Sequence, residues 1–428
     1  MLARTAASAL LATVITQTLA IPSLCPNIAA PLHPYQLAPG WSVVKVADGL
    51  HSPRDLQFDT QGRLLIVEEG VGIRQHTVDS ATGCVTASRM LISDTALNHG
   101  IHLSLVGTTL FASSAASVFR WAYDPITGNA GTDPIEVVHG MAVTGHVTRT
   151  LAIPPQAPDL LVVSHGSSEN LDYNSTNSAM ARAIVKVFNM STVPETAAGY
   201  DYASEGWNAG FGLRNEVGLA FDGNNMLWGV ENSADGLTRT VNGISEDVHN
   251  DNPAEELNLL GDVTKPNDAW YGYPWCFTVW RPDEITDRPF SIGEQFVLAP
   301  DERFNDTICQ RLSVAPRLSI QAHSAPLGSK FDARYMNLFV ALHGSWDRQP
   351  PTGFKVVAIP FTRSPQGSYE PVKGPSSDSG YINVFYPPDV SQCSSDTCAR
   401  PVGLAFDAVG RLYITSDASG EVFQLTAA

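Results

Sequence analysis

Arginine and histidine residues stand at matching positions along the 428-residue chain, each just before a short apolar segment. Arginine binds carboxylates through two parallel hydrogen bonds, so several such residues at one place would hold a small polyanion. For a single arginine, capping a turn or pairing with a nearby aspartate is the more ordinary role. The residues that stand just before these apolar segments are Arg54, Asn98 with His99, His146, Arg214 with Asn215, His323 and Arg400.

His146 differs from the others because Gly145 precedes it and Arg149 follows it closely. A neutral imidazole accepts a proton from a substrate hydroxyl near neutral pH, which is general-base chemistry. A purely structural histidine remains the alternative at this position.

Two acidic segments and one aromatic segment are further candidates. Residues 246–258 and 231–236 are rich in the oxygen ligands that Ca²⁺ prefers, although neither segment has EF-hand spacing. A solvated acidic loop explains residues 246–258 equally well. Residues 270–277 (WYGYPWCF) would wall a sugar or quinone pocket by stacking, or pack under an insertion.

The elements that must position these residues form a repeat. Residues 53–68, 218–231 and 403–416 each combine an apolar strand, a turn of Asp, Gly or Asn, and a second apolar strand. Weaker copies occur at 99–114, 146–165 and 325–343, the last ending at His343. Six hairpins predict an all-β, six-bladed β-propeller, with a β-sandwich as the alternative. In a propeller the first strands begin at one face of the channel, which would bring the cations together. The interval 236–320 then holds outer strands and a large insertion.

Charge and composition exclude several classes of protein. The net charge is −17 without a basic run, so we expect neither nucleic acid nor a membrane as a partner. Dinucleotide-binding, Walker and nucleophile-elbow motifs are missing from the sequence. Residues 1–20 resemble a secretory signal peptide, which leaves residues 21–428 as a single domain.

The cysteines and three sequons agree with secretion. Six cysteines in an oxidising compartment favour disulfides, and their spacing suggests 393 with 398, 276 with 309, and 25 with 84, one of many possible connectivities. The sequons begin at Asn174, Asn189 and Asn305 and indicate surface loops of a eukaryotic secreted glycoprotein.

The combined motifs resemble the soluble quinoprotein sugar dehydrogenases, and most closely the fungal secreted pyranose dehydrogenases that use pyrroloquinoline quinone. The resemblance covers essentially the whole mature chain. It is carried by residues 145–151, 212–215, 218–222, 230–235, 249–258, 271–276, 341–348 and 350–355.

This resemblance implies a propeller that holds pyrroloquinoline quinone and Ca²⁺ over the channel mouth. His146 would remove the substrate hydroxyl proton, and Arg214 with Asn215 would hold charge on the quinone oxygens. The resemblance also places Asn98, His99 and Arg400 at the cofactor, and the Ca²⁺ ligands at the carbonyls of Ala234 and Asp235. A lysine of bacterial relatives has no counterpart; its region aligns with 343–348, so His343, Trp346 or Arg348 would contact the cofactor instead.

We therefore expect a monomeric oxidoreductase that oxidises a hydroxyl of a pyranose or keto-sugar. Its cofactor carries three carboxylates, which gives Arg54, Arg214, Arg348 and Arg400 a common purpose. Some fungal relatives carry a cytochrome domain and a cellulose-binding module; we expect neither here, so electrons would pass to a secreted haem or copper protein, or to a quinone. A Ca²⁺-dependent lactone hydrolase using Glu68 and Glu231, and a non-catalytic carbohydrate-binding propeller, are the alternatives.

Overall fold

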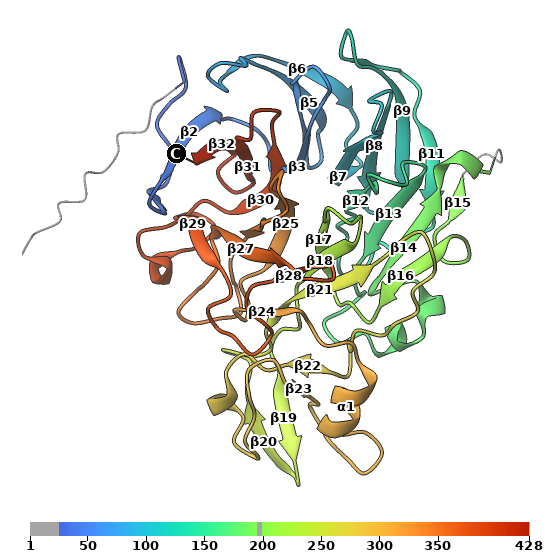
Figure 1. The fold of residues 1–428 in the computed structure, drawn as a ribbon, viewed down its shortest axis with the longest axis vertical. Helices are drawn as coiled ribbons and strands as arrows, with labels where there is room; N and C mark the ends of the chain where they lie inside the picture. The colour runs from blue at the N-terminus through green and yellow to red at the C-terminus, as the bar shows by residue number, and fades with distance from the viewer. Residues whose placement is uncertain (1–24, 195–198, 428) are drawn as a thin grey trace, which may run out of the picture.

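Six sheets, antiparallel except for one parallel edge pair in the second, stand around a central channel in a computed structural model that describes residues 25–194 and 199–427 (Figure 1). The predicted signal peptide lies outside these residues. All six predicted hairpins form the two innermost strands of a blade, which confirms the six-bladed β-propeller.

The first three blades follow in chain order. The first contains β3 (Pro53–Phe58), β4 (Leu64–Glu68), β5 (Gly72–Val78) and β6 (Val85–Ser93). The second contains β7 (Leu97–Leu103), β8 (Thr109–Ser114), β9 (Val118–Asp124), β10 (Asn129–Ala130), β11 (Ile135–His139) and β15 (Tyr200–Asp201). The third contains β12 (Leu151–Ala152), β13 (Leu160–His165), β14 (Ile184–Asn189) and β16 (Trp207–Phe211).

The last three blades include both ends of the described chain. The fourth contains β17 (Glu216–Phe221), β18 (Leu227–Glu231), β21 (Glu255–Gly261) and β24 (Leu318–Ile320). The fifth contains β25 (Pro326–Phe331), β26 (Asn337–Leu342), β27 (Lys355–Arg363), β28 (Tyr369–Pro371), β29 (Ile382–Tyr386) and β1 (Gln36–Leu37). The sixth contains β30 (Pro401–Phe406), β31 (Leu412–Ser416), β32 (Glu421–Ala427) and β2 (Trp41–Ala47).

Glycines on the inner strands allow neighbouring blades to approach closely. A Cβ at Gly403 would lie 2.6 Å from the Arg54 carbonyl oxygen, and one at Gly328 would lie 2.2 Å from that of Val402. A larger side chain would push these backbones apart. This packing fixes the spacing of the inner strands, and with it the loops at the channel mouth.

Pairing and disulfides close the ring. Strand β2 pairs antiparallel with β32, which joins the amino-terminal strand to the last blade. The three disulfides are Cys25–Cys84, Cys276–Cys309 and Cys393–Cys398, which confirms the predicted connectivity.

The predicted insertion forms a lobe at the bottom of Figure 1. It contains hairpin β19 (Thr238–Val241) and β20 (Ile244–Asp247), hairpin β22 (Phe277–Thr278) and β23 (Gln295–Phe296), and helix α1 (Asp306–Leu312). Arg239 is buried in this lobe, where it binds Asp287 and Asp306. Short 3₁₀ turns complete the described elements: η1 (Tyr173–Thr176), η2 (Ser178–Met180), η3 (Met190–Thr192), η4 (Pro282–Glu284) and η5 (Val390–Gln392).

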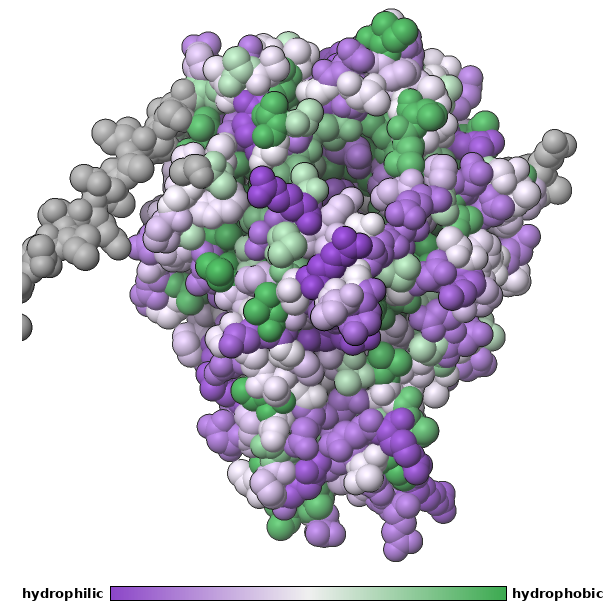
Figure 2. Space-filling model, in the orientation of Figure 1, coloured by the Kyte–Doolittle hydropathy of each residue, from purple (hydrophilic) through white to green (hydrophobic). Residues whose placement is uncertain are grey.

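Apolar side chains are scattered over the face shown in Figure 2, where polar ones predominate. Within the described residues, no helix has the length and the apolar character needed to cross a bilayer.

Candidate functional site

A pocket of about 160 Å³ lies where the loops before the inner strands meet. A neighbouring cleft of about 460 Å³ shares the lining residues Ser345 and Trp346 with it, and we call the two together the recess. The pocket brings together the predicted residues His146, Arg214, Asn215, Asp235 and Trp346, and the cleft adds Arg348 and Arg400.

The ring of His146 is held in one tautomer. Its Nδ1 lies 3.1 Å from the carbonyl oxygen and 3.1 Å from the hydroxyl oxygen of Ser167, and that hydroxyl donates to the Glu169 carbonyl. Nδ1 must therefore carry the proton, which leaves Nε2 as a free base. Burial, and next the charge of Arg214, lower the pKa of His146 to about 4, so the ring is neutral at pH 7.

Gly145 lets the His146 loop approach its neighbour. Its φ is +66°, and a Cβ there would lie 2.4 Å from the Ser168 carbonyl oxygen. The glycine before His146 is thus required by close packing against the segment that orients the imidazole.

The guanidinium group of Arg214 donates hydrogen bonds to several oxygen atoms. Its Nη2 donates to Asp235 Oδ2 and to Asn170 Oδ1, both at 2.9 Å, and its Nη1 donates to the carbonyls of Asn232 and Ser233. Its backbone N–H donates to buried Glu231. Arg214 therefore has a fixed position beside His146 without a ligand.

Asp235 and His323 form a second pair at the pocket. His323 Nδ1 lies 3.5 Å from Asp235 Oδ1, and its Nε2 donates to the His249 carbonyl. Burial opposes protonation, but the hydrogen bond to Asp235 and the charge of Glu255 raise the pKa of His323 above its usual value. Both ring nitrogens of His323 face acceptors, an arrangement that favours the protonated ring.

The predicted calcium ligands are only partly accessible. Ala234 is fully buried, and the Asp235 carbonyl accepts a 2.7 Å hydrogen bond from Asn170. The Asp235 carboxylate instead lies near Asp347 and His323, with one ligand atom of each residue within 4.8 Å of the others. Carboxylate and carbonyl oxygens suit Ca²⁺, whereas a protonated His323 cannot ligate it.

A chain of four hydrogen-bonded side chains links the neighbouring blades one, six and five at the channel mouth. Arg54 donates to Asp417 at 2.8 Å, His343 Nε2 lies 2.9 Å from the same carboxylate, and Arg400 donates to His343 Nδ1 at 2.9 Å. His343 is therefore a neutral Nε2–H tautomer, in agreement with the lowering of its pKa by burial. Arg54 also donates to His99 Nδ1 at 3.3 Å.

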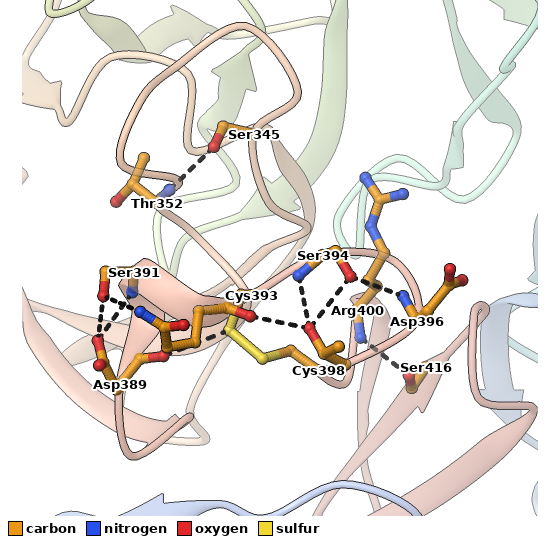
Figure 3. Close-up of a disulfide and its surroundings, with 12 residues drawn as sticks. Ser345, Thr352, Asp389, Ser391, Cys393, Ser394, Asp396, Cys398, Arg400 and Ser416 are labelled. Atoms are coloured by element: carbon orange, nitrogen blue, oxygen red, sulfur yellow. Dashed lines mark hydrogen bonds between the residues drawn. A yellow bond between two sulfur atoms is a disulfide. The ribbon is translucent and has the colours of Figure 1, made fainter.

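Asp417 is the acid that organises this chain. Burial alone would raise the pKa of Asp417, but the hydrogen bond from His343 and the charges of Arg54 and Arg400 hold that pKa at about 2. Figure 3 shows Arg400 beside the Cys393–Cys398 disulfide, with its guanidinium pointing away from the sulfur atoms.

The remaining predicted residues lie around this chain. Asn98 donates to the Val147 carbonyl at 2.9 Å, and its Oδ1 is buried without a partner among the described residues. Arg348 binds Asp251 at 2.7 Å and also the Pro350 carbonyl. Trp346 is 76% exposed at the edge of the recess. The aromatic segment 270–277 does not line this recess; its buried rings pack under the insertion.

The structure gives most of the predicted arginines an acidic partner. Arg54, Arg214 and Arg348 each bind an aspartate, so local pairing and convergence occur together. The sequence argument missed Asp417, Asn170 and Ser167. Asp417 follows the last residue of β31, which is the position that His343 occupies after β26; that shared register is the signal that could have found it.

The residues fit a polycarboxylate cofactor. Within residues 25–194 and 199–427, Arg54 Nη2 and Arg400 Nη1 make no hydrogen bond, and the Asn215 side chain makes none either. Arg400 and Asn215 line the recess, and Arg54 is linked to Arg400 through Asp417 and His343, so these donors are left available for carboxylate oxygens. The carboxylates of Glu68 and Glu231, which a lactone hydrolase would use as metal ligands, are buried, already accept N–H groups and do not line the recess.

Comparison with known proteins places the chain among described relatives. A family model described as TrAA12-like matches residues 35–428. The pyrroloquinoline quinone-dependent pyranose dehydrogenase of Coprinopsis cinerea is 40% identical over 406 residues, which cover 93% of this chain and 55% of that protein. This chain thus spans about half the length of that relative. The pyrroloquinoline quinone-dependent sugar dehydrogenase of Hypocrea jecorina (strain QM6a) is 37% identical, over 91% of this chain and 88% of that protein.

Solved structures show the same relationship. The holo form of the pyranose dehydrogenase PQQ domain from Coprinopsis cinerea has a TM-score of 0.91 at 39% identity, covering 94% of this chain and 99% of that one. The calcium structure of the Trichoderma reesei AA12 enzyme has a TM-score of 0.88 at 36% identity, covering 95% and 100%. These matches confirm the resemblance that the sequence motifs indicate.

Proposed function

The chain belongs to the TrAA12-like family, and from this premise we propose that it is a secreted oxidoreductase that oxidises a hydroxyl of a pyranose or keto-sugar with pyrroloquinoline quinone and Ca²⁺. The observation that carries the proposal is the neutral His146, with Nε2 free, beside Arg214 and the spare donors of Arg54 and Arg400. The names of the relatives at 37–40% identity support the cofactor and the substrate class.

His146 acts as the general base that takes the substrate hydroxyl proton on Nε2. The Ser167 carbonyl keeps Nδ1 protonated and so fixes which nitrogen reacts. Arg214, which Asp235 and Asn170 hold in place, presents fixed positive charge where negative charge develops. When bound, the quinone supplies a two-electron acceptor and Ca²⁺ a Lewis acid.

The cofactor would be held by residues that line the recess, which are Asn215, Trp346, Arg348 and Arg400, and by residues outside its lining, which are Arg54, Asn98, His99 and His343. Arg54 and Arg400 use their free guanidinium nitrogens on its carboxylates, and Asn98, His99, Asn215, His343, Trp346 and Arg348 complete the surroundings. Oxygens near Ala234 and Asp235, including the Asp235 carboxylate, are the proposed Ca²⁺ ligands. Electrons then pass to an external acceptor, such as a secreted haem or copper protein or a quinone. Three disulfides support an oxidising compartment.

Absorption titration of the purified protein with pyrroloquinoline quinone, with and without a Ca²⁺ chelator, tests the proposal. We expect uptake at micromolar cofactor, loss of uptake with the chelator, and reduction of a dye acceptor by sugars. Arg400→Gln should weaken cofactor binding roughly 10- to 100-fold, the value of one lost charged hydrogen bond. The exposed Arg363→Gln serves as the matched control. Absence of uptake in the parent protein would overturn the proposal.

A further inference from the structure

An aromatic cleft lies on the outside of the propeller, separate from the recess described above. Trp270, Trp275, Phe304, Phe211 and Thr176 line it, and it offers about 500 Å³ of space. The ring of Trp275 lies 5.9 Å from that of Phe304, and Trp275 is 39% exposed. An exposed apolar cleft is typical of a surface that a ligand or another group covers. None of its lining residues belongs to the recess that holds His146.

A sequon forms one edge of the aromatic cleft. Asn174, Ser175 and Thr176 lie in the 3₁₀ turn η1, which Tyr173 begins. In such a turn the side chains at i and i+3 lie on the same side, and here both reach Trp275. The ring of Tyr173 lies 4.6 Å from that of Trp275, and the Thr176 hydroxyl accepts a 2.9 Å hydrogen bond from Trp275 Nε1. The attachment residue therefore stands between two residues that contact the cleft.

We propose that Asn174 carries an N-linked glycan whose first N-acetylglucosamine packs on the Trp275 ring and covers the aromatic cleft. Asn174 Nδ2 forms a bond to the anomeric carbon of an oligosaccharide linked to a lipid diphosphate. The bond from that carbon to the diphosphate oxygen breaks, the lipid diphosphate leaves with the electron pair, and the amide loses one proton. The C–H face of a pyranose is apolar, so its burial against an indole ring is favourable.

The three sequons differ in the hydrogen bonds that their asparagine side chains make within the described residues. Asn174 is exposed, and its side chain makes no hydrogen bond within the described residues. Asn305 lies beside Phe304, but its Oδ1 accepts from Ile308 N–H as the N-cap of α1 and its Nδ2 donates to Asp301. The Oδ1 of Asn189 accepts from Ser191. Asn174 alone of the three combines a free amide with an aromatic platform.

Glycopeptide mass spectrometry of the protein secreted by a fungal host tests occupancy. We expect glycan on Asn174 and its complete loss in Asn174→Gln, while Asn189→Gln leaves the Asn174 glycopeptide unchanged. Unmodified Asn174 in the secreted parent protein would overturn the proposal.

Trimming of the native protein by an endoglycosidase that cuts between the first two sugars tests where the glycan lies. We expect the Asn174 glycan to be trimmed more slowly in the parent than in Trp275→Ala, by roughly two- to tenfold, the factor that one aromatic contact supplies. Acrylamide quenching of tryptophan fluorescence should increase in Asn174→Gln but not in Asn189→Gln. Equal trimming rates would show that the glycan does not pack on Trp275. Binding of a soluble oligosaccharide to the cleft of the fully glycosylated protein would equally overturn it.

Discussion

Replacing His146 by asparagine removes the proposed base and leaves its anchor in place. The asparagine Nδ2 stands where the imidazole Nδ1 donates to the Ser167 carbonyl at 3.1 Å, so the loop after Gly145 keeps its position. The variant has no group that can take a proton at the place of Nε2. General-base catalysis contributes roughly 10²- to 10⁴-fold, or about 3–5 kcal/mol of barrier, so kcat should fall by that factor while cofactor binding changes little.

The pH profile gives an independent readout of the same residue. In the cofactor-free protein the pKa of His146 is about 4, and NMR titration of the imidazole should reproduce this depressed value. A base works only when unprotonated, so kcat/KM should be constant at neutral pH and fall tenfold per pH unit below the pKa. Carboxylates of a bound cofactor favour the imidazolium and move the acidic limb upward, to between about 4 and the ordinary 6.5.

The assay is reduction of a dye acceptor by the protein loaded with pyrroloquinoline quinone and Ca²⁺, with absorption of the bound cofactor measured in parallel. His139→Asn, in strand β11 of the second blade, is the matched control and should keep full activity. A rate for His146→Asn within tenfold of the parent, with equal cofactor loading, would refute the assignment of the base. An acidic limb above 6.5 would refute the electrostatic argument.

Three stability predictions follow from the described contacts. Asp417→Asn should lower the unfolding free energy by about 2 kcal/mol at pH 7. Because the pKa of Asp417 is lowered to about 2, the stability that its carboxylate contributes is present above pH 3.8 and is lost as pH falls toward 2. The unfolding free energies of parent and variant should therefore converge in denaturant titrations at acid pH. Glu256→Gln should stabilise the protein at pH 8 and leave its stability unchanged at pH 4. Burial raises the pKa of Glu256 to about 7, so the parent protein loses the stability of the protonated carboxyl group as pH rises from 4.5 through 7. Equal effects of the substitution at both pH values would contradict this argument. Replacing both cysteines of the Cys25–Cys84 disulfide by serine should lower the unfolding free energy by about 4 kcal/mol, against about 2 kcal/mol for Cys393–Cys398, because the first disulfide closes a longer loop. Urea unfolding measures both values, and the reverse order would contradict the chain-entropy argument.

The parts that the sequence predicts well are those encoded locally. Each blade begins with a hairpin whose apolar strands and turn lie within about 15 residues, so the six-bladed fold follows from repeated short patterns. The disulfide between Cys393 and Cys398 is equally local. His146 and Arg214 lie in one pocket because a propeller places the loops before the inner strands of blades three and four at one face.

The parts that the sequence cannot predict depend on contacts between distant blades. Asp417 meets Arg54 across 363 positions of the chain, and Asn170 meets Arg214 across 44. Periodicity carries no information about such pairs, because an aspartate after a strand looks the same whether it faces solvent or a guanidinium. The tautomer of His146 likewise depends on Ser167, a residue without any motif of its own.

The aspartates at the recess explain how an acidic protein with a net charge of −17 keeps arginines together before a ligand arrives. The charges of Arg54 and Arg400 would repel each other, and burial would add a desolvation cost to Arg400. Asp417 removes this repulsion through one direct contact with Arg54 and one relayed by His343 to Arg400. Each guanidinium still retains a nitrogen without a partner among the described residues, so pairing fixes its orientation and leaves a donor for a carboxylate. Preorganisation of this kind reduces the side-chain entropy lost when a ligand binds. The counter-ions are therefore part of the proposed binding site, and removing Asp417 should weaken cofactor binding even though it removes a negative charge from the neighbourhood of an anion.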